Sequence, residues 1–417
     1  RLGALLVNPG GPGRSGIAAL DGSLTILDPA VRDHVDVVGL DPRGVGASAG
    51  VDCLDASQLE AWLHPDPAPD VMVPDGLRAR VDQARRLVAP CAELDPADLA
   101  HLDTLTAARD LDIVRAALGD ARLTYLGVSY GTTLGASYAS LFPQRVGRLV
   151  LDAGVPPDLA PMARTEGLAA GFEGALAAFV RYCVASRPCP LGGSPAAALA
   201  TLRAWLADLQ VRPLPDSTDR ALTGSHALAA LLLGIADDET WPELATALTA
   251  AIDDRDPRAM LSLADRLDGR GAHGDPAAEL AANVAITCAD QSRPDLAALA
   301  AHGRRLAAAS PTFGAHLLDA AILCAAWPAE GGPAAGMRAP ARALASSPDA
   351  RILVIGTTHD PAAPYPWSQA LAADLGAALL TYDGYGHTAF GHSNACVSEA
   401  VSTLLLTGAL PDEPARC

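Results

Sequence analysis

The stretch Leu126-Gly127-Val128-Ser129-Tyr130-Gly131 has the pattern G-x-S-x-G, and it decides how this sequence is interpreted. It follows an apolar run at 123–127 that is predicted to be a strand, and a predicted helix begins after it. The glycines allow the backbone to take a sharp, strained turn that exposes the serine hydroxyl above the end of the strand. Because the bare pattern occurs in many proteins, its place between a strand and a helix carries the argument. We predict that Ser129 is a nucleophile.

The segments on both sides of this motif predict a parallel sheet. Short apolar runs bounded by Gly, Pro and Asp alternate with longer amphipathic patterns, such as the one at 107–118. Continuous apolar strands that alternate with helices are typical of a parallel sheet with both faces covered. The predicted strands are 4–7, 35–40, 123–127, 148–151, 351–356 and 378–382.

The middle of the chain has a different character. From about 156 to 340 the sequence is rich in Ala and Leu and repeats a helical periodicity, with breaks rich in Pro and Gly. We therefore expect a helical cap at 156–340, inserted between an N-terminal part of the sheet domain at 1–155 and a C-terminal part at 341–417. A further insertion at about 53–103 is predicted to be rich in loops.

A serine nucleophile needs a base, and the base needs a carboxylate that orients it. In an α/β sheet of this kind the acid and then the histidine follow the serine in the chain. Asp360 and His387 each follow a predicted strand of the second half, so both are expected at the carboxyl edge of the sheet beside Ser129. Asp152, which follows an earlier strand, is the rival acid.

The loop Asn8-Pro9-Gly10-Gly11-Pro12-Gly13 follows the first predicted strand. It lacks the Lys-Ser/Thr of a phosphate-binding loop and the spacing of a dinucleotide-binding fingerprint. Beside a serine nucleophile, such a loop supplies one backbone N–H to the oxyanion hole, and the residue after the serine supplies the other. We predict that Gly11 and Tyr130 provide these two donors. An ordinary tight turn is the alternative.

The chain has eight cysteines, at positions 53, 91, 183, 189, 288, 324, 396 and 417. They are either small buried hydrophobic residues or a disulfide framework. Two features favour disulfides: Cys417 is the last residue, and Cys183 and Cys189 bracket a short loop that contains proline. We predict pairing in sequence order (Cys53 with Cys91, Cys183 with Cys189, Cys288 with Cys324, Cys396 with Cys417) and hence an oxidising compartment. No CxxC motif or Cys/His cluster indicates a zinc site.

Charge excludes several partners. The 417 residues carry 48 acids and 30 bases, a formal net charge of −18, and no lysine. Nucleic acid or an anionic membrane surface would repel such a protein. The longest uncharged stretch, 123–144, is too polar to be a membrane span. Since Arg1 leads directly into an apolar run, we expect that a signal peptide and some N-terminal strands precede this point in the full protein.

Taken together, the motifs resemble those of the secreted bacterial tripeptidyl aminopeptidases, α/β-hydrolases related to the prolyl aminopeptidases. The similar segments are Asn8 to Gly13, Asp41 to Ser48, Gly127 to Thr132, Ala285 to Asp290, Cys324 to Pro328, Asp360-Pro361 and Gly386 to Thr388. The resemblance implies a capped α/β-hydrolase fold, export with a lipid anchor in some members, and roles for Ser129 as nucleophile, Asp360 as orienting acid and His387 as base. Two segments depart from the family pattern, Arg14-Ser15 and Asp152 to Pro156.

The resulting prediction is a serine hydrolase that cleaves peptide bonds near free N-termini through an acyl-enzyme, without metal or cofactor. An aminopeptidase needs a group for the substrate's α-amino group, and a partly buried carboxylate suits it. Asp290 is the candidate, although a solvated aspartate at a helix end is the alternative interpretation. An esterase or a specialised amidase with the same triad is the main alternative function, and a binding protein on an inactive hydrolase fold is the third.

Overall fold

The computed structural model describes residues 2–66, 68–186, 189–217, 220–270, 276–329, 347, 349–412 and 414–417. In these residues a parallel sheet of seven strands has the order β2-β1-β3-β4-β7-β8-β9. The strands are β1 (Ala4–Asn8), β2 (Asp36–Gly39), β3 (Leu123–Val128), β4 (Val146–Asp152), β7 (Arg351–His359), β8 (Ala378–Tyr385) and β9 (Ala415–Arg416). Each of the six predicted strands is present, and the short β9 is an addition at the edge.

Helices cover both faces of this sheet, because neighbouring residues of each strand point to opposite sides. Leu5 and Val7 of β1 pack in the hydrophobic cluster with helices α1 (Leu20–Ile26), α2 (Pro29–His34) and α19 (Ala395–Thr407). Ala4 and Leu6 pack on the other face with α6 (Thr104–Ala117), α7 (Tyr130–Leu141) and α18 (Tyr365–Leu375). The predicted parallel sheet with two covered faces is confirmed.

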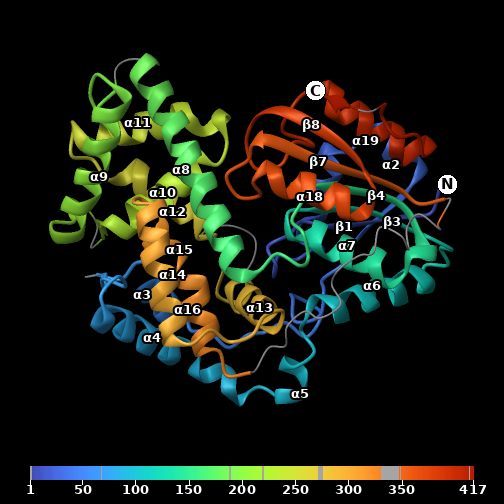
Figure 1. The fold of residues 1–417 in the computed structure, drawn as a ribbon, viewed down its shortest axis with the longest axis horizontal. Helices are drawn as coiled ribbons and strands as arrows, with labels where there is room; N and C mark the ends of the chain where they lie inside the picture. The colour runs from blue at the N-terminus through green and yellow to red at the C-terminus, as the bar shows by residue number, and fades with distance from the viewer. Residues whose placement is uncertain are drawn as a thin grey trace.

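The chain between β4 and β7 is helical. Helices α8 (Pro161–Ser186), α9 (Pro195–Val211), α10 (Gly224–Ile235), α11 (Trp241–Ile252) and α12 (Arg258–Leu267) share a hydrophobic core of their own. We call α8–α12 the helical lobe, and Figure 1 shows it on the side of the molecule opposite the sheet. A short antiparallel pair, β5 (Leu214–Pro215) and β6 (Ala221–Leu222), accompanies it.

The last helices of this region belong to a different core. Residues of α13 (Pro276–Ala289), α14 (Leu296–Ala309) and α16 (Asp319–Ala326) pack in the same cluster as α6 and α7, and α15 (Gly314–Leu317) precedes α16. The predicted cap therefore contains two differently packed sets of helices. Its predicted end, residue 340, lies outside the described residues, so the limits 1–155, 156–340 and 341–417 stay predictions.

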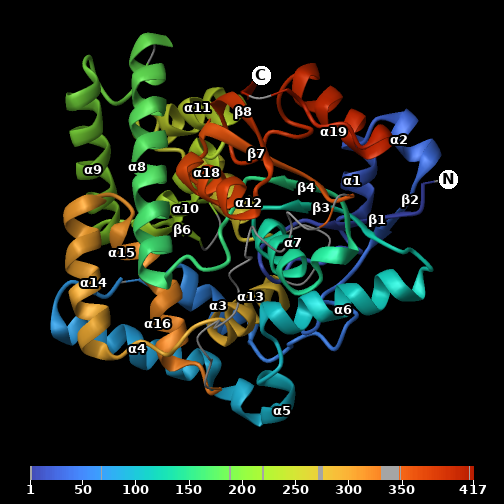
Figure 2. The ribbon, with the colours of Figure 1, turned by 45° about the vertical axis from the view of Figure 1, so that its right-hand side comes forward.

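The insertion at 53–103 is helical, and the prediction of a loop-rich segment is wrong. It forms α3 (Ala56–Leu63), α4 (Pro74–Val88), the 3₁₀ helix η1 (Ala89–Glu93) and α5 (Pro96–Leu99). The helical period of α4 is hidden because arginines and aspartates fill six of its fifteen positions, one of them on the packed side. This residue, Arg80, is buried and forms a bidentate ion pair with Asp319 of α16. Figure 2 shows α4 running beneath α14 and α16.

All four disulfides pair in sequence order, as predicted. Their Cα–Cα distances are 5.0 Å for Cys53–Cys91, 5.3 Å for Cys183–Cys189, 5.1 Å for Cys288–Cys324 and 5.7 Å for Cys396–Cys417. The third bond joins α13 to α16, and the fourth fastens the C-terminus to α19. These bonds agree with a protein that matures in an oxidising compartment.

Among the described residues, one helix, α8, is long and apolar enough to cross a membrane by length and composition alone. Four charged residues interrupt its apolar sequence. In the structure α8 packs against α9, α14 and β7. These are the contacts of a helix inside a packed protein, and no clear membrane span follows from them.

Candidate active site

Ser129 lies in the turn between β3 and α7, where the sequence predicts a strained nucleophile. Its backbone has φ 56° and ψ −119°, a conformation that is unusual for a residue with a side chain and that is common at functional turns. The N–H of Ser129 donates to the carbonyl of Asp152 at 2.9 Å, so the neighbouring strand β4 helps to hold the turn. The strand–turn–helix context of the serine is confirmed.

Asp360 and His387 are in direct contact. Ring nitrogen Nδ1 of His387 lies 2.9 and 3.0 Å from the two carboxylate oxygens of Asp360. The Asp360 side chain is completely buried, and it also accepts from the N–H groups of Ala362 and Ala363 at 2.8 Å. The His387 side chain is 27% exposed, so the imidazole is reachable from solvent while its orienting carboxylate is not.

The contact through Nδ1 leaves Nε2 of His387 to receive a proton from a serine hydroxyl. In the described part of the chain, no hydrogen bond joins the Ser129 hydroxyl to this ring, and such bonds are often long in the absence of substrate. Burial opposes protonation of His387, but the carboxylates of Asp360 and Asp152 outweigh it and raise the pKa of His387 above its usual value. The imidazole is thus a stronger base than a free histidine.

The glycine loop after β1 touches the serine turn. Gly10 has φ 93°, and a β-carbon at this position would lie 2.5 Å from the carbonyl oxygen of Val128 and 3.4 Å from the nitrogen of Tyr130. Only glycine permits this approach. Tyr130 is the first residue of α7, where an N–H has no acceptor within the helix. Within the described residues the N–H of Gly11 also has no acceptor, so both predicted oxyanion donors are free.

Comparison with known proteins places these features in a family. Residues 3–246 match the family model described as "alpha/beta hydrolase fold", and residues 310–417 match the model described as "TAP-like protein". The chain belongs to the α/β-hydrolase family. It is a serine hydrolase, and the resemblance to the tripeptidyl aminopeptidases found in the sequence is confirmed.

The relatives of this hydrolase carry three kinds of name. The chain is 34% identical to serine protease Hip1 of Mycobacterium tuberculosis, with all of this chain and 81% of that protein aligned. It is 36% identical to carboxylesterase B of the same species, with 80% of that protein covered. It is 30% identical to the tripeptidyl aminopeptidase of Streptomyces coelicolor, with 76% of that protein covered. In both of these alignments, too, the whole of this chain is covered.

In the hydrolase, the motif that begins at Asp41 supports the glycine loop. The Asp41 carboxylate accepts from the Ser15 hydroxyl at 2.6 Å, from the Ile17 N–H at 3.1 Å and from the Ala47 N–H at 2.9 Å. It therefore joins the chain just after the glycine loop to the loop after β2. Ser15, one of the departures from the family pattern, is part of this network.

Asp152, the rival acid, does not contact the His387 ring. Its carboxylate is fully buried and accepts from the N–H groups of Ala389 and Phe390. Burial raises the pKa of Asp152 to about 6, although the two backbone donors act in the opposite direction. Of the two candidate acids, it is therefore Asp360 that contacts the imidazole of His387.

Asp290, the candidate amine anchor, directly follows α13. The hydroxyl group of Thr104 joins it to the side chain of Tyr130, the residue after Ser129. The Asp290 carboxylate accepts from the N–H of Thr104 at 2.8 Å and from the Thr104 hydroxyl at 2.6 Å. That hydroxyl lies 2.7 Å from the phenol oxygen of Tyr130. Burial raises the pKa of Asp290 to about 6, against the two bonds from Thr104. The charge of Arg164 in α8 acts on this carboxylate and lowers its pKa, but the two side chains form no salt bridge among the described residues.

Three contacts of the site were not predicted from the sequence. Besides Thr104, the side chain of Asn283 in α13 donates to the carbonyl of Pro12 in the glycine loop at 2.9 Å. The carbonyl of Ala236, just after α10, accepts the N–H of His387 at 3.1 Å. Each joins residues far apart in the chain, and no local pattern in the sequence signals them.

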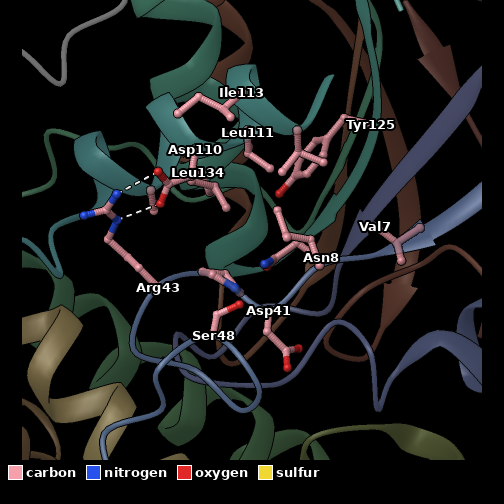
Figure 3. A pocket seen from close by; sticks show the side chains of 14 residues that line it. Val7, Asn8, Asp41, Arg43, Ser48, Asp110, Leu111, Ile113, Tyr125 and Leu134 are labelled. Carbon is pink, nitrogen blue, oxygen red and sulfur yellow. Dashed lines mark hydrogen bonds and ion pairs between the residues drawn. The ribbon is translucent and has the colours of Figure 1, made fainter. Parts of the chain in front are cut away.

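A cavity of about 300 Å³ lies beside the site but is not lined by any of the three predicted triad residues. Figure 3 shows it between Asn8, the loop after β2 and helix α6, with the ion pair of Arg43 and Asp110 at one side. The apolar side chains of Leu111, Ile113 and Leu134 line much of the rest. Its lining comes from β1, β3, α6, α7 and the loop after β2, whereas Asp360 follows β7 in the other half of the sheet.

Proposed function

We propose that this hydrolase is an exopeptidase that removes short peptides from free N-termini, with Ser129 as nucleophile, His387 as base and Asp360 as the acid that orients the base. Ser129 attacks the carbonyl carbon while its proton passes to Nε2 of His387. Asp360 stabilises the imidazolium, and the N–H groups of Gly11 and Tyr130 bind the oxyanion. His387 then gives the proton to the leaving amine, and water, activated by the same ring, releases the acyl group.

The preference for peptides over simple esters rests on Asp290. This carboxylate is partly buried, and the Thr104 hydroxyl joins it to the Tyr130 side chain, yet no cation neutralises it by a salt bridge within the described residues. Buried carboxylates are rarely left without a cationic partner, and an ammonium group of the substrate would supply one. The net charge of −18 adds a weak attraction for a cationic N-terminus. The tripeptidyl aminopeptidase at 30% identity supports this choice.

A carboxylesterase is the second candidate function. One observation favours it: the relative named carboxylesterase B has a slightly higher identity than the relatives named for peptide cleavage. The same triad and oxyanion donors hydrolyse both esters and amides, so the two functions differ only in what binds the rest of the substrate.

Hydrolysis of a tripeptide anilide with a free N-terminus, measured beside its N-acetylated form, separates the two candidates. We expect a strong preference for the free amine, with Ser129→Ala as the blank. In Asp290→Asn this preference should be largely lost. The matched control is Asp295→Asn, which removes a carboxylate that only caps α14. Equal rates on both anilides, together with rapid cleavage of a simple ester, would contradict the exopeptidase and favour the esterase.

The preference should also depend on pH. The pKa of Asp290 is about 6 because of burial, so the carboxylate gains a proton as the pH falls below 6 and no longer attracts an ammonium group. We expect the ratio of the two anilide rates to decrease from pH 7 to pH 5. The ratio should stay constant over this range in Asp290→Asn.

We also propose that the protein acts outside the cytoplasm, on peptides or small acyl compounds. The four disulfides support this location, since they persist in oxidising compartments. The predicted division into a sheet domain and a cap at 156–340 forms part of the same proposal.

A further inference from the structure

Asp152 is a fully buried carboxylate at the end of β4 that the triad does not use. One of its oxygens accepts from the N–H groups of Ala389 at 3.0 Å and Phe390 at 2.8 Å, and the other lies 3.2 Å from the Ala389 nitrogen. These two residues come two and three positions after His387. The carboxylate therefore holds the chain immediately behind the imidazole.

The same residue also holds the serine turn. The backbone carbonyl of Asp152 accepts the N–H of Ser129 at 2.9 Å. Between His387 and Ala389 the chain passes through Thr388 with φ 80°, a left-handed conformation that a β-branched residue rarely adopts. Such a conformation persists only where the surrounding structure fixes it, and Asp152 supplies two of the hydrogen bonds that do so.

The roles of the two carboxylates on neighbouring strands are thus different. Asp360 contacts the ring of His387, whereas Asp152 contacts only backbone N–H groups behind it. The charged groups that affect the imidazole are Asp360 after β7, Asp152 at the end of β4 and Arg14 after the glycine loop. The two carboxylates favour the protonated ring, and Arg14 opposes it.

We infer that Asp152 is a positioning residue for the reaction: its carboxylate holds the loop of His387 through the Ala389 and Phe390 N–H groups, and its carbonyl holds the Ser129 turn. This inference rests on the proposed roles of Ser129 and His387. It requires that the carboxylate act through His387 and not on the substrate. Loss of its charge should therefore change the rate and its pH dependence but leave substrate binding almost unchanged.

The test is Asp152→Asn. This substitution keeps the shape of the side chain, removes its charge and brings an amide N–H₂ close to the backbone N–H groups that the carboxylate accepts. The probe is the rate at which a fluorophosphonate labels Ser129 between pH 5 and 9, which needs no peptide substrate. We expect labelling about 10- to 100-fold slower, the size of effect that a small misplacement of a catalytic group causes. The acid limb of the pH profile should move to lower pH. On any substrate that the wild type cleaves, kcat should fall while KM stays within about twofold.

Asp112→Asn is the matched control, because Asp112 is another buried carboxylate, paired with Arg115 and Arg145 away from the triad. It should lower the thermal midpoint without moving the acid limb. An unchanged acid limb in a folded Asp152→Asn protein would overturn the inference, and so would a rate loss that Asp112→Asn reproduces. If the wild type is not labelled at all, the proposed nucleophile is wrong and the inference falls with it.

Discussion

The edge of the sheet and the helical lobe each contain a histidine with limited exposure, and the two histidines have opposite properties. His387 at the sheet edge has its ring nitrogen against Asp360, and the nearby carboxylates raise its pKa. His226 of α10 stacks on His64 with 3.8 Å between ring centroids, and burial together with its neighbour lowers the pKa of His226 to about 4. Carboxylates lie near both rings, since Glu60 is 3.7 Å from Nε2 of His226. At His387 the carboxylates outweigh burial, whereas at His226 burial and the neighbouring His64 outweigh them.

The largest expected effect is on kcat, and it tests the difference between His387 and His226. His387→Ala should lower kcat by about 10⁶-fold on whichever substrate the wild type cleaves, because the serine loses its base. His226→Phe should keep kcat within about threefold, since the ring lies in the helical lobe and a stacked aromatic replaces it. Steady-state kinetics on both variants, with circular dichroism as a check of folding, makes the measurement. A His387→Ala protein that retains a tenth of the activity would contradict the assignment of the base.

Much of the sheet edge could be predicted from the sequence because its groups follow strands. Ser129, Asp360 and His387 each follow a predicted strand within a few residues, and parallel strands bring such positions together whatever the distance along the chain. The glycine loop also follows a strand, and it is recognisable because its backbone conformations require glycine. The predicted fold is confirmed, and so is the pairing of the cysteines.

The parts that could not be predicted depend on contacts between distant helices. Thr104 and Asp290 are 186 residues apart, and neither position differs from an ordinary polar residue near a helix end. The sequence of α4 does not predict a helix because Arg80 occupies a position that the structure buries through an ion pair. A pattern of apolar residues cannot reveal packing that relies on paired charges.

A smaller effect is expected where the sheet edge meets α13. Gly13 has φ 96°, and a β-carbon there would lie 2.7 Å from the nitrogen of Asn283 and from the carbonyl oxygen of Glu279. Gly13→Ala should push the glycine loop off α13 and misplace the N–H of Gly11. We expect kcat to fall by about 10²- to 10³-fold, as when one oxyanion donor is removed.

Gly192→Ala is the control for Gly13→Ala, and it lies in the helical lobe. Gly192 has φ 111°, but no atom of the described residues is within 4 Å of its β-carbon position. Both variants should lose about 1–2 kcal/mol of stability from the unfavourable φ. Only Gly13→Ala should lose activity. Equal activity in the two variants would show that the glycine loop does not supply the oxyanion hole.

The smallest expected effect is on stability in acid, and it belongs to the helical lobe. The pKa of His226 is about 4 in the folded protein, mainly because of burial, against about 6.5 in an unfolded chain. Between these two values the unfolded chain binds a proton that the folded chain does not, so stability decreases as the pH falls from 6.5 to 4. The full loss is at most about 3.4 kcal/mol, at about 1.36 kcal/mol for each of the 2.5 pH units.

Substitution of His226 should remove this loss of stability in acid, whereas substitution of Asp152 at the sheet edge should increase the loss. In His226→Phe the free energy of unfolding should depend less on pH between 6.5 and 4, whereas His34→Phe, at an exposed histidine of α2, should behave as the wild type.

The pKa of Asp152 is about 6 because of burial, so its folded form binds a proton that the unfolded chain lacks, and stability increases as the pH falls through the same range. Asp152→Asn should therefore be more sensitive to acid than the wild type. Urea unfolding at pH 4, 5, 6 and 7 gives the free energy of unfolding of all three variants. If His226→Phe and Asp152→Asn change its pH dependence in the same direction, the proposed difference between the helical lobe and the sheet edge is wrong.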